Sequence, residues 1–256
     1  LYTVTCGINY YKMSFTETYG ITKEVYTTEE LYRACEILVE RMNELHDQVR
    51  RNETGEMIVS KDARREAVSA MQALGASYEK LEGFYPLPKG LAGSWILSVQ
   101  GLTGVYSPFT VEANYNKEMT GYNQPFTMCH ELAHLKGFMQ EEEANMIGFL
   151  ACEQSEEPEF RYSSAMMGWI YCGNELYDRD KEKYQSLSER LPKEAHKDLE
   201  ANSRFWDEHE GIISEASEKV NDAYLKANRQ EAGVESYDQV ADLIVQYLVE
   251  KEKIWK

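Results

Sequence analysis

The segment PFTMCHELAHLKGFMQEEEAN, at residues 125–145, constrains the fold of this chain more than any other stretch of its sequence. It contains two histidines four residues apart, His130 and His134. On an α-helix this spacing places both imidazoles on one face, with their Cβ atoms roughly 6 Å apart. Pro125 is favourable in the first turn of a helix, and Gly137 is favourable just after its end. The segment is therefore predicted to form a helix that presents two imidazoles side by side.

Two imidazoles at this spacing can bind a single metal ion, because each can reach a Zn²⁺ at about 2.1 Å. Glu131 follows the first histidine and can flank such an ion without ligating it. There it can accept a proton from a metal-bound water, whose pKa the ion lowers to about 7. This order of residues is the HExxH motif of metallopeptidases, and it predicts Glu131 as the general base. The alternative is a helix face with two histidines that have only structural partners.

A catalytic zinc ion usually has three protein ligands and one water, so a third ligand is required. The extension HExxHxxGxxH fails here, because Gln140 occupies its last position and a neutral amide is a poor zinc ligand. Three glutamates follow directly. Glu143 is expected on the buried face of the next helix, whereas Glu141 shares a face with polar and small residues and is expected nearer to solvent. We predict Glu143 as the third ligand, with Glu142 as the alternative.

Most of the chain has the apolar periodicity of helices. A long helix is predicted from about residue 28, where Thr27 and Glu30 have capping-box spacing, to the turn RNETG. Further helices are predicted over residues 62–82, 125–136, 140–153 and 158–178, in parts of 181–232, and over 237–254.

The segment 86–123 differs, because it is rich in Gly, Pro, Ser, Thr and aromatic residues. Its best strand candidate covers residues 110–115, and Pro108 suggests an edge strand or an entry turn. The predicted fold class is α+β, predominantly helical, with a small β-sheet. No repeat or low-complexity linker divides residues 21–256, so a single domain is expected there.

Composition excludes several other classes. The net charge of −17 opposes binding to nucleic acid and docking on anionic lipid through a basic patch. The 5 cysteines form no CxxC pair, which excludes a zinc ribbon or a thioredoxin-type motif. The hydrophobic fraction of 43% is sufficient for a sizeable core, and no run of about 18 apolar residues predicts a membrane span.

Several motifs in this order resemble one known family. They are GINYYK, SPFTVEAN, PFTMCHELAHLKGF, EEEAN and YLKANRQEAGVESY. Together they resemble a family of bacterial membrane-anchored HExxH proteins of unknown function that is grouped with the zincin-type, gluzincin-like zinc metallopeptidases. The resemblance implies a zincin-like fold, in which the active-site helix lies beneath a small sheet and the following helix supplies a glutamate. It also implies Zn²⁺ as the cofactor and Glu143, in the E-A-N stretch, as its third ligand.

The resemblance further implies where the protein acts. The family carries transmembrane helices upstream of the stretch that matches Gly7 to Lys12. Residues 1–20 are accordingly expected to be a juxtamembrane segment after a membrane anchor absent from this chain, and 21–256 a catalytic domain outside the cytoplasmic membrane. A peptide or protein of the cell envelope is the expected substrate.

In zincins an edge strand beside the metal pairs with an extended peptide. The segment from Val111 to Tyr115 is the predicted edge here, and its polar residues Glu112 and Asn114 are predicted to contact substrate or to orient the histidines. A purely structural turn and strand is the alternative. The oxyanion of peptide hydrolysis also needs a donor. Tyr224 and Tyr237 are favoured for this role, and the other candidates are Tyr106, Tyr122, His196 and His209.

The sequence thus predicts a zinc-dependent metallopeptidase. Its metal ligands would be His130, His134 and Glu143, and Glu131 would deprotonate the attacking water. The alternative is a non-catalytic, metal-stabilised surface binding or sensor module on the same scaffold. The presence of Glu131 disfavours this alternative, since structure alone needs no general base.

Overall fold

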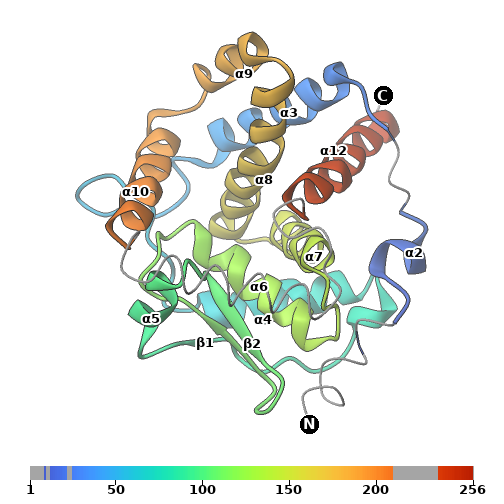
Figure 1. Ribbon diagram of the computed structural model, residues 1–256, viewed down its shortest axis with the longest axis vertical. Coiled ribbons are helices and arrows are strands. Elements are labelled where there is room, and N and C mark those ends of the chain that lie inside the picture. Colours follow the sequence, from blue (N-terminus) through green and yellow to red (C-terminus); the bar gives the residue numbers. More distant parts are fainter. Residues whose placement is uncertain (1–8, 10–11, 22–24, 210–235, 256) are drawn as a thin grey trace.

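The computed structural model describes residues 9, 12–21, 25–209 and 236–255 (Figure 1). The described chain is predominantly helical and carries a small three-stranded sheet, as the sequence predicts. Its elements, in chain order, are α2 (Phe15–Tyr19), α3 (Thr28–Leu45), α4 (Ala63–Gly75), η2 (Glu79–Leu81), β1 (Lys89–Gly90), α5 (Ser94–Val99), β2 (Gly104–Ser107), β3 (Glu112–Tyr115), α6 (Asn123–Leu135), α7 (Glu141–Glu153), α8 (Pro158–Arg179), α9 (Lys181–Ser188), α10 (Lys193–His209) and α12 (Ser236–Trp255).

The long N-terminal helix α3 begins at the capping box that the sequence predicts. Thr27 Oγ1 accepts the N–H of Glu30 at 3.2 Å, and the Glu30 carboxylate accepts the N–H of Thr27 at 2.9 Å. The next helix, α4, ends at Gly75, seven residues before the predicted end at Glu82. A Cβ atom at Gly75 would lie 2.9 Å from the carbonyl oxygen of Leu81, so the chain turns back closely against this glycine and a short 3₁₀ turn replaces the last helical turn.

The sheet has the strand order β1-β3-β2, so β3 is central. β3 pairs in parallel with β1 and antiparallel with β2, where Gly104 lies opposite Tyr115 and Ser107 opposite Glu112. The strand predicted over residues 110–115 is therefore present at Glu112–Tyr115, but its prediction as an edge strand is wrong. The edge beside it is β2, whose four residues carry too weak an alternation of apolar and polar side chains to be recognised from sequence.

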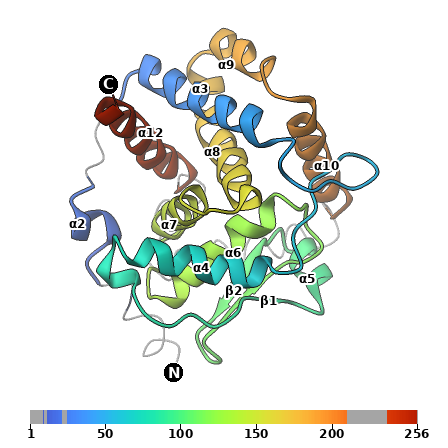
Figure 2. The same ribbon diagram turned by 180° about the vertical axis from the view of Figure 1, so that it is seen from behind.

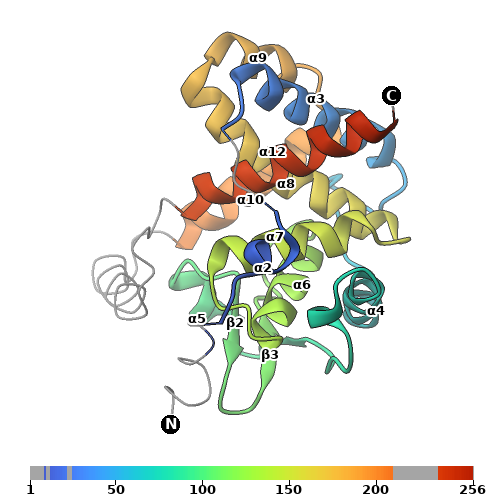
Figure 3. The same cartoon turned by 90° about the vertical axis from the view of Figure 1, so that its right-hand side faces the viewer.

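Helix α6 lies at the centre of the molecule. It packs against α4, α7 and α8 and against the strands β2 and β3 (Figures 2 and 3). Eleven of its residues are buried, including His130, Glu131 and His134. On the other side of α8, helices α3 and α12 complete the core. Among the described residues, no helix combines the length and the apolar character that a membrane crossing requires.

Candidate metal centre

His130 and His134 lie one turn apart on α6, and their imidazole rings meet edge to face with centroids 4.6 Å apart. Each is 9% exposed. Phe126, one turn earlier, stacks on the His130 ring at 6.5 Å and 30°. The i, i+4 spacing therefore produces the shared face that the sequence predicts. Apolar packing of Phe126 against one ring helps to fix its orientation.

The first residue of α7 completes a group of three. Glu141 Oε2 lies 3.3 Å from His130 Nε2, and Glu141 Oε1 lies 3.6 Å from His134 Nε2. All three ligand atoms lie within 4.8 Å of one another. These separations exceed the 2.7–2.9 Å of a charged hydrogen bond. They are close to the roughly 3.4 Å between two ligands that bind one tetrahedral ion at about 2.1 Å. The three side chains could therefore hold a metal ion.

The loop between α6 and α7 orients the second histidine. Gly137 adopts a left-handed conformation, with φ of 94°, and turns the chain directly after the helix. The Phe138 carbonyl oxygen then lies 2.7 Å from His134 Nδ1. A donated Nδ1–H leaves the lone pair of Nε2 directed at Glu141 and the metal position.

Glu131 lies about 100° around α6 from His130, near both histidines, and its carboxylate reaches β2 of the sheet. A Cβ atom at Gly104 of β2 would lie 2.5 Å from Glu131 Oε1, so only glycine leaves room for this carboxylate. Glu131 is 4% exposed, and its Oε2 atom has no hydrogen-bond partner among the described residues. Burial raises the pKa of Glu131 to about 7, although the nearby histidines His130 and His134 oppose the rise. The group is thus suited to exchange a proton near neutral pH.

The histidine–carboxylate cluster shifts the pKa values of its own members in opposite directions. Burial would lower the pKa of His134, but the Glu141 carboxylate outweighs it and raises this pKa to about 9. Burial would likewise raise the pKa of Glu141, but His134 and His130 hold it well below the ordinary range of a glutamate. Both shifts show that the site stabilises a positive charge beside the Glu141 carboxylate.

The predicted third ligand, Glu143, does not join this group. It lies two residues, or about 200°, further around α7 than Glu141, and therefore on the opposite face. It is 4% exposed, and its Oε1 atom accepts the N–H of Phe15 at 2.5 Å. Glu143 is buried as the sequence predicts, but the apolar face that buries it turns away from the histidines. The alternative, Glu142, is half-buried and is also absent from the group.

A glycine on α7 is the signal that would have found Glu141. A Cβ atom at Gly148 would lie 3.3 Å from the backbone nitrogen of His130 and 3.4 Å from the carbonyl oxygen of Phe126. Gly148 thus lets the backbones of α6 and α7 approach closely. Glu141 precedes it by seven residues, on the same face, together with the buried Asn145. A face with a buried glycine packs against another helix, although Glu141 itself, at the start of α7, is nearer to solvent than Glu143, as the sequence predicts.

The two predicted substrate-binding residues of β3 have structural partners. The Glu112 carboxylate forms an ion pair with Lys89 Nζ. Asn114 is 5% exposed, and its Nδ2 donates to the carbonyl oxygens of Val105 at 3.3 Å and Glu112 at 3.2 Å. Their position on the central strand, rather than on an edge, accounts for this, because both sides of β3 are already paired.

The candidate oxyanion donors are dispersed. Tyr224 lies outside the described residues, and so does the side chain of Tyr237, whose backbone belongs to the first turn of α12. Tyr122 is fully buried in the core. Tyr106 lies on β2, two residues from Gly104, and therefore on the face of the sheet that meets α6. Of these tyrosines, Tyr106 is the one whose strand contacts Glu131.

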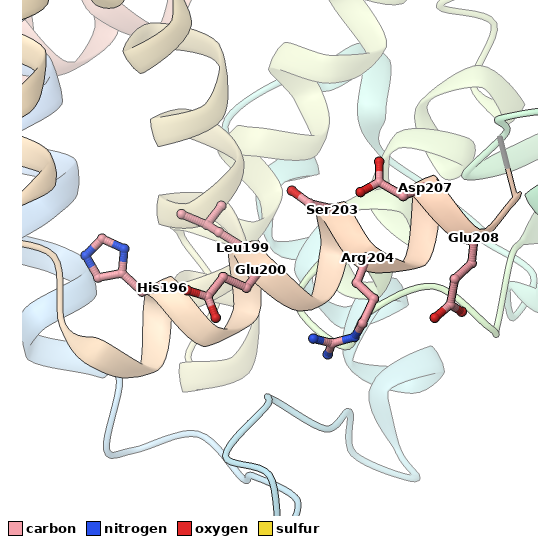
Figure 4. A pocket seen from close by; sticks show the side chains of 7 residues that line it. All are labelled: His196, Leu199, Glu200, Ser203, Arg204, Asp207 and Glu208. Atoms are coloured by element: carbon pink, nitrogen blue, oxygen red, sulfur yellow. The ribbon is translucent and has the colours of Figure 1, made fainter.

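His196 and His209, the remaining candidates, both lie on α10. His209 Nδ1 is 2.7 Å from the carbonyl oxygen of Phe205. Figure 4 shows a shallow surface hollow along this helix, lined by His196, Leu199, Glu200, Ser203, Arg204, Asp207 and Glu208. Its charged side chains are spread along one helix rather than directed at one point, and Arg204 is paired with Glu56 at 2.7 Å. The hollow therefore lacks the convergent geometry of the cluster on α6 and α7.

Comparison with curated proteins found no match, and comparison with solved structures found none. A family model does match, over residues 1–245, and its description is "Protein of unknown function (DUF3810)". The match covers nearly the whole chain, including both helices of the candidate metal centre. The chain therefore belongs to the DUF3810 family of proteins of unknown function.

Proposed function

We propose that this protein is a zinc-dependent metallopeptidase in which His130, His134 and Glu141 bind the metal. One observation carries the proposal. Ligand atoms of three side chains on two helices lie within 4.8 Å of one another, with the Glu141 oxygens 3.3 and 3.6 Å from the two Nε2 atoms. A buried carboxylate with an unpartnered oxygen, that of Glu131, adjoins one of the ligands in sequence. A cluster that served only to pair charges would have closer contacts and would not need the second acid.

The donor set favours zinc over other divalent ions. Two imidazole nitrogens and one carboxylate oxygen suit Zn²⁺, whereas Mg²⁺ and Ca²⁺ prefer six or more oxygen ligands. Three protein ligands also leave a fourth position for water, as in catalytic rather than structural zinc sites. The Nδ1 contact of His134 with the Phe138 carbonyl supports the same assignment, because metal-binding histidines usually donate their second N–H to such a group.

Glu131 supplies the acid–base chemistry. When bound, zinc acts as a Lewis acid that makes water nucleophilic near neutral pH. Glu131 accepts the proton of the attacking water and then donates it to the leaving amine. Burial raises its pKa to about 7 in the metal-free protein, and a raised pKa favours the proton uptake that a general base requires. Gly104 and the burial of α6 keep this carboxylate away from bulk solvent.

The edge of β2 is our proposed binding site for an extended peptide, in place of the segment from Val111 to Tyr115. The N–H of Asn116 donates to the carbonyl oxygen of Thr103 at 2.8 Å. Bonded and non-bonded pairs alternate along antiparallel strands, so the backbone groups of Gly104 point away from β3. In the described part of the chain no strand pairs with this edge. A peptide added here would bring its backbone beside Glu131.

Tyr106 is our proposed oxyanion donor. It shares a strand face with Gly104 and lies about 6.6 Å further along β2, by the usual rise of a strand. Tyr224 and Tyr237 remain predictions for the same role. The cell envelope as the site of action, an upstream membrane anchor and a peptide or protein substrate also remain predictions, which depend on the resemblance to membrane-anchored HExxH proteins.

The proposal can be tested with purified protein. Metal analysis should find one zinc per chain, and a mixed peptide library should be cleaved by the wild type but not by Glu131→Gln. Glu142→Gln serves as the matched control, because it removes a neighbouring half-buried charge outside the cluster. A protein that binds one zinc tightly but cleaves no peptide under any of these conditions would instead be the metal-stabilised binding or sensor module.

A further inference from the structure

The buried carboxylate of Glu143 is directed at the N-terminal segment rather than at the metal centre. Its Oε1 atom accepts the N–H of Phe15 at 2.5 Å, across 128 positions of the chain. Phe15 begins α2, a short helix that lies beside α7 in Figures 1 and 3. The bond is buried on both sides, since Phe15 is 0% and Glu143 4% exposed. Glu143 thus links the segment around Phe15, which is distant in sequence, to α7, the helix that carries Glu141.

The ring of Phe15 makes a second attachment, this time to the loop between α6 and α7. It meets the Phe138 ring edge to face, with centroids 5.5 Å apart. Tyr19 and Tyr78 pack against the Phe15 ring, each with ring centroids 5.0 Å from it. Aromatic pairs of this kind contribute about 0.5–1.5 kcal/mol each beyond the area that they bury. Phe138 is therefore held by the ring of Phe15, which two tyrosines fix in turn.

A third contact lies at the glycine that ends α6. A Cβ atom at Gly137 would lie 3.0 Å from Lys12 Nζ and 3.4 Å from the side-chain carbonyl oxygen of Asn9. The described residues Asn9 and Lys12–Gly20, which we term the N-terminal clasp, thus lie against the loop at Gly137, at Phe138 and, through Glu143, at the start of α7.

This loop joins two of the proposed metal ligands. His134 precedes it and Glu141 follows it, and the Phe138 carbonyl within it contacts His134 Nδ1 at 2.7 Å. Displacement of Phe138 would both release the His134 ring and change its distance from Glu141. The N–H of Phe138 donates to the Ala133 carbonyl oxygen only over a long bond of 3.3 Å.

We infer that Phe15 and Glu143 are positioning residues, through which the N-terminal clasp holds the 137–140 loop and thereby keeps His134 and Glu141 at metal-binding distance. The inference rests on the proposed metal site. It implies that the state of the N-terminal segment controls the metal affinity of the protein.

The test compares Glu143→Leu and Glu143→Gln in the full chain. Leucine removes the acceptor for the Phe15 N–H at nearly the same volume, whereas the glutamine amide oxygen can still accept it. We expect Glu143→Leu to weaken zinc affinity about 10–100-fold, as does the loss of other groups that orient ligands. Glu143→Gln should retain affinity within about threefold. Phe15→Leu, which keeps bulk but loses the aromatic contacts, should show an intermediate loss, and Glu142→Gln should show none.

Two further measurements separate positioning from general stability. The visible absorption spectrum of bound Co²⁺ reports ligand geometry, and it should change in Glu143→Leu but not in Glu143→Gln. Amide hydrogen exchange of the metal-free protein should be faster at residues 137–140 in Glu143→Leu. Unchanged affinity, spectrum and loop exchange in a variant of lowered stability would overturn the inference and leave the proposed function intact. A wild type that binds no metal at all would overturn both.

Discussion

Two buried carboxylates of this protein have contrasting surroundings. Asp198 on α10 is 2% exposed, and it is paired with Arg51 at 3.0 Å and accepts the Tyr162 hydroxyl and the Met57 N–H, each at 2.7 Å. Glu131 on α6 is 4% exposed, and one of its oxygens has no hydrogen-bond partner in the described part of the chain. The fold thus gives Asp198 a cation and hydrogen-bond donors, whereas it leaves one oxygen of Glu131 without a hydrogen bond from the described residues.

The difference has an energetic meaning. An unpaired charge in a protein interior costs several kcal/mol, and the usual remedy is a cation and hydrogen bonds, as at Asp198. At Glu131 the glycine of β2 brings backbone close but supplies no cation, so the carboxylate keeps its proton up to about pH 7. Structural acids are therefore distinguished here from the proposed catalytic acid by their partners rather than by their burial.

Glu131→Gln gives the sharpest test of this contrast. Glutamine has the same shape but cannot transfer a proton, so kcat for peptide cleavage should fall about 10²–10⁴-fold. Zinc stoichiometry should stay at the wild-type level, because Glu131 is not a ligand. The free energy of unfolding should be unchanged or slightly higher, since a buried ionisable group is removed. Steady-state kinetics, metal analysis and urea denaturation check the three expectations, and a variant with wild-type kcat would exclude Glu131 as the base.

Asp198→Ala tests whether the buried, fully paired carboxylate of Asp198 stabilises the fold. It leaves Arg51 as a buried charge without its carboxylate and removes the acceptor for Tyr162 and for the Met57 N–H. The free energy of unfolding should fall by about 3–5 kcal/mol. Zinc affinity of the folded variant should remain within about threefold of the wild type. A stability loss below 1 kcal/mol would mean that Asp198 is no better satisfied than Glu131, and the contrast would fail.

The sequence was sufficient for much of this picture. Periodicity predicted α3, α4, α6, α7 and α8, although α4 ends early, and it missed the short helix α5. The spacing of His130 and His134 predicted their shared face. The strand edge was missed because β2 is only four residues long and its pairing with β3 is a contact between segments, which local patterns do not encode.

The third ligand shows the same limit more clearly. Helical periodicity correctly placed Glu143 on a buried face, but α7 is buried on several sides, between α6, α8 and α12. Burial alone therefore could not tell which side carries the histidines. The close approach of Gly148 to α6 distinguishes the two faces, and it depends on tertiary packing.

Separate replacement of Glu141 and Glu143 by glutamine tests which of the two glutamates of α7 binds the metal. Glu141→Gln should lower zinc affinity at least about 100-fold, or about 2.7 kcal/mol, because an anionic ligand becomes a poor neutral one. Glu143→Gln should leave affinity within about threefold. Competition with a chromogenic chelator measures both. Equal losses in the two variants would contradict the assignment of Glu141 and would revive Glu143 as the ligand.

The pH dependence of zinc binding gives the most direct test of the electrostatics. The pKa of His134 is raised from 6.5 to about 9 in the metal-free protein, and only the unprotonated Nε2 can bind zinc. Each binding event below pH 9 must therefore release this proton, so His134 alone should make affinity rise up to about tenfold per pH unit below pH 9 and then level off.

The same proton stabilises the metal-free fold, so the stability of this fold should fall with rising pH while zinc affinity rises. Between pH 6.5 and about 9 the folded chain holds a proton at His134 that the unfolded chain has lost, so its contribution to stability is complete below 6.5 and disappears as the pH rises through 9. Metal-free protein should thus become less resistant to urea over the range in which zinc binds more tightly. In Glu141→Gln the carboxylate that raises the pKa is absent, and both slopes should move to lower pH. Profiles identical to the wild type in that variant would show that Glu141 does not control the charge of His134.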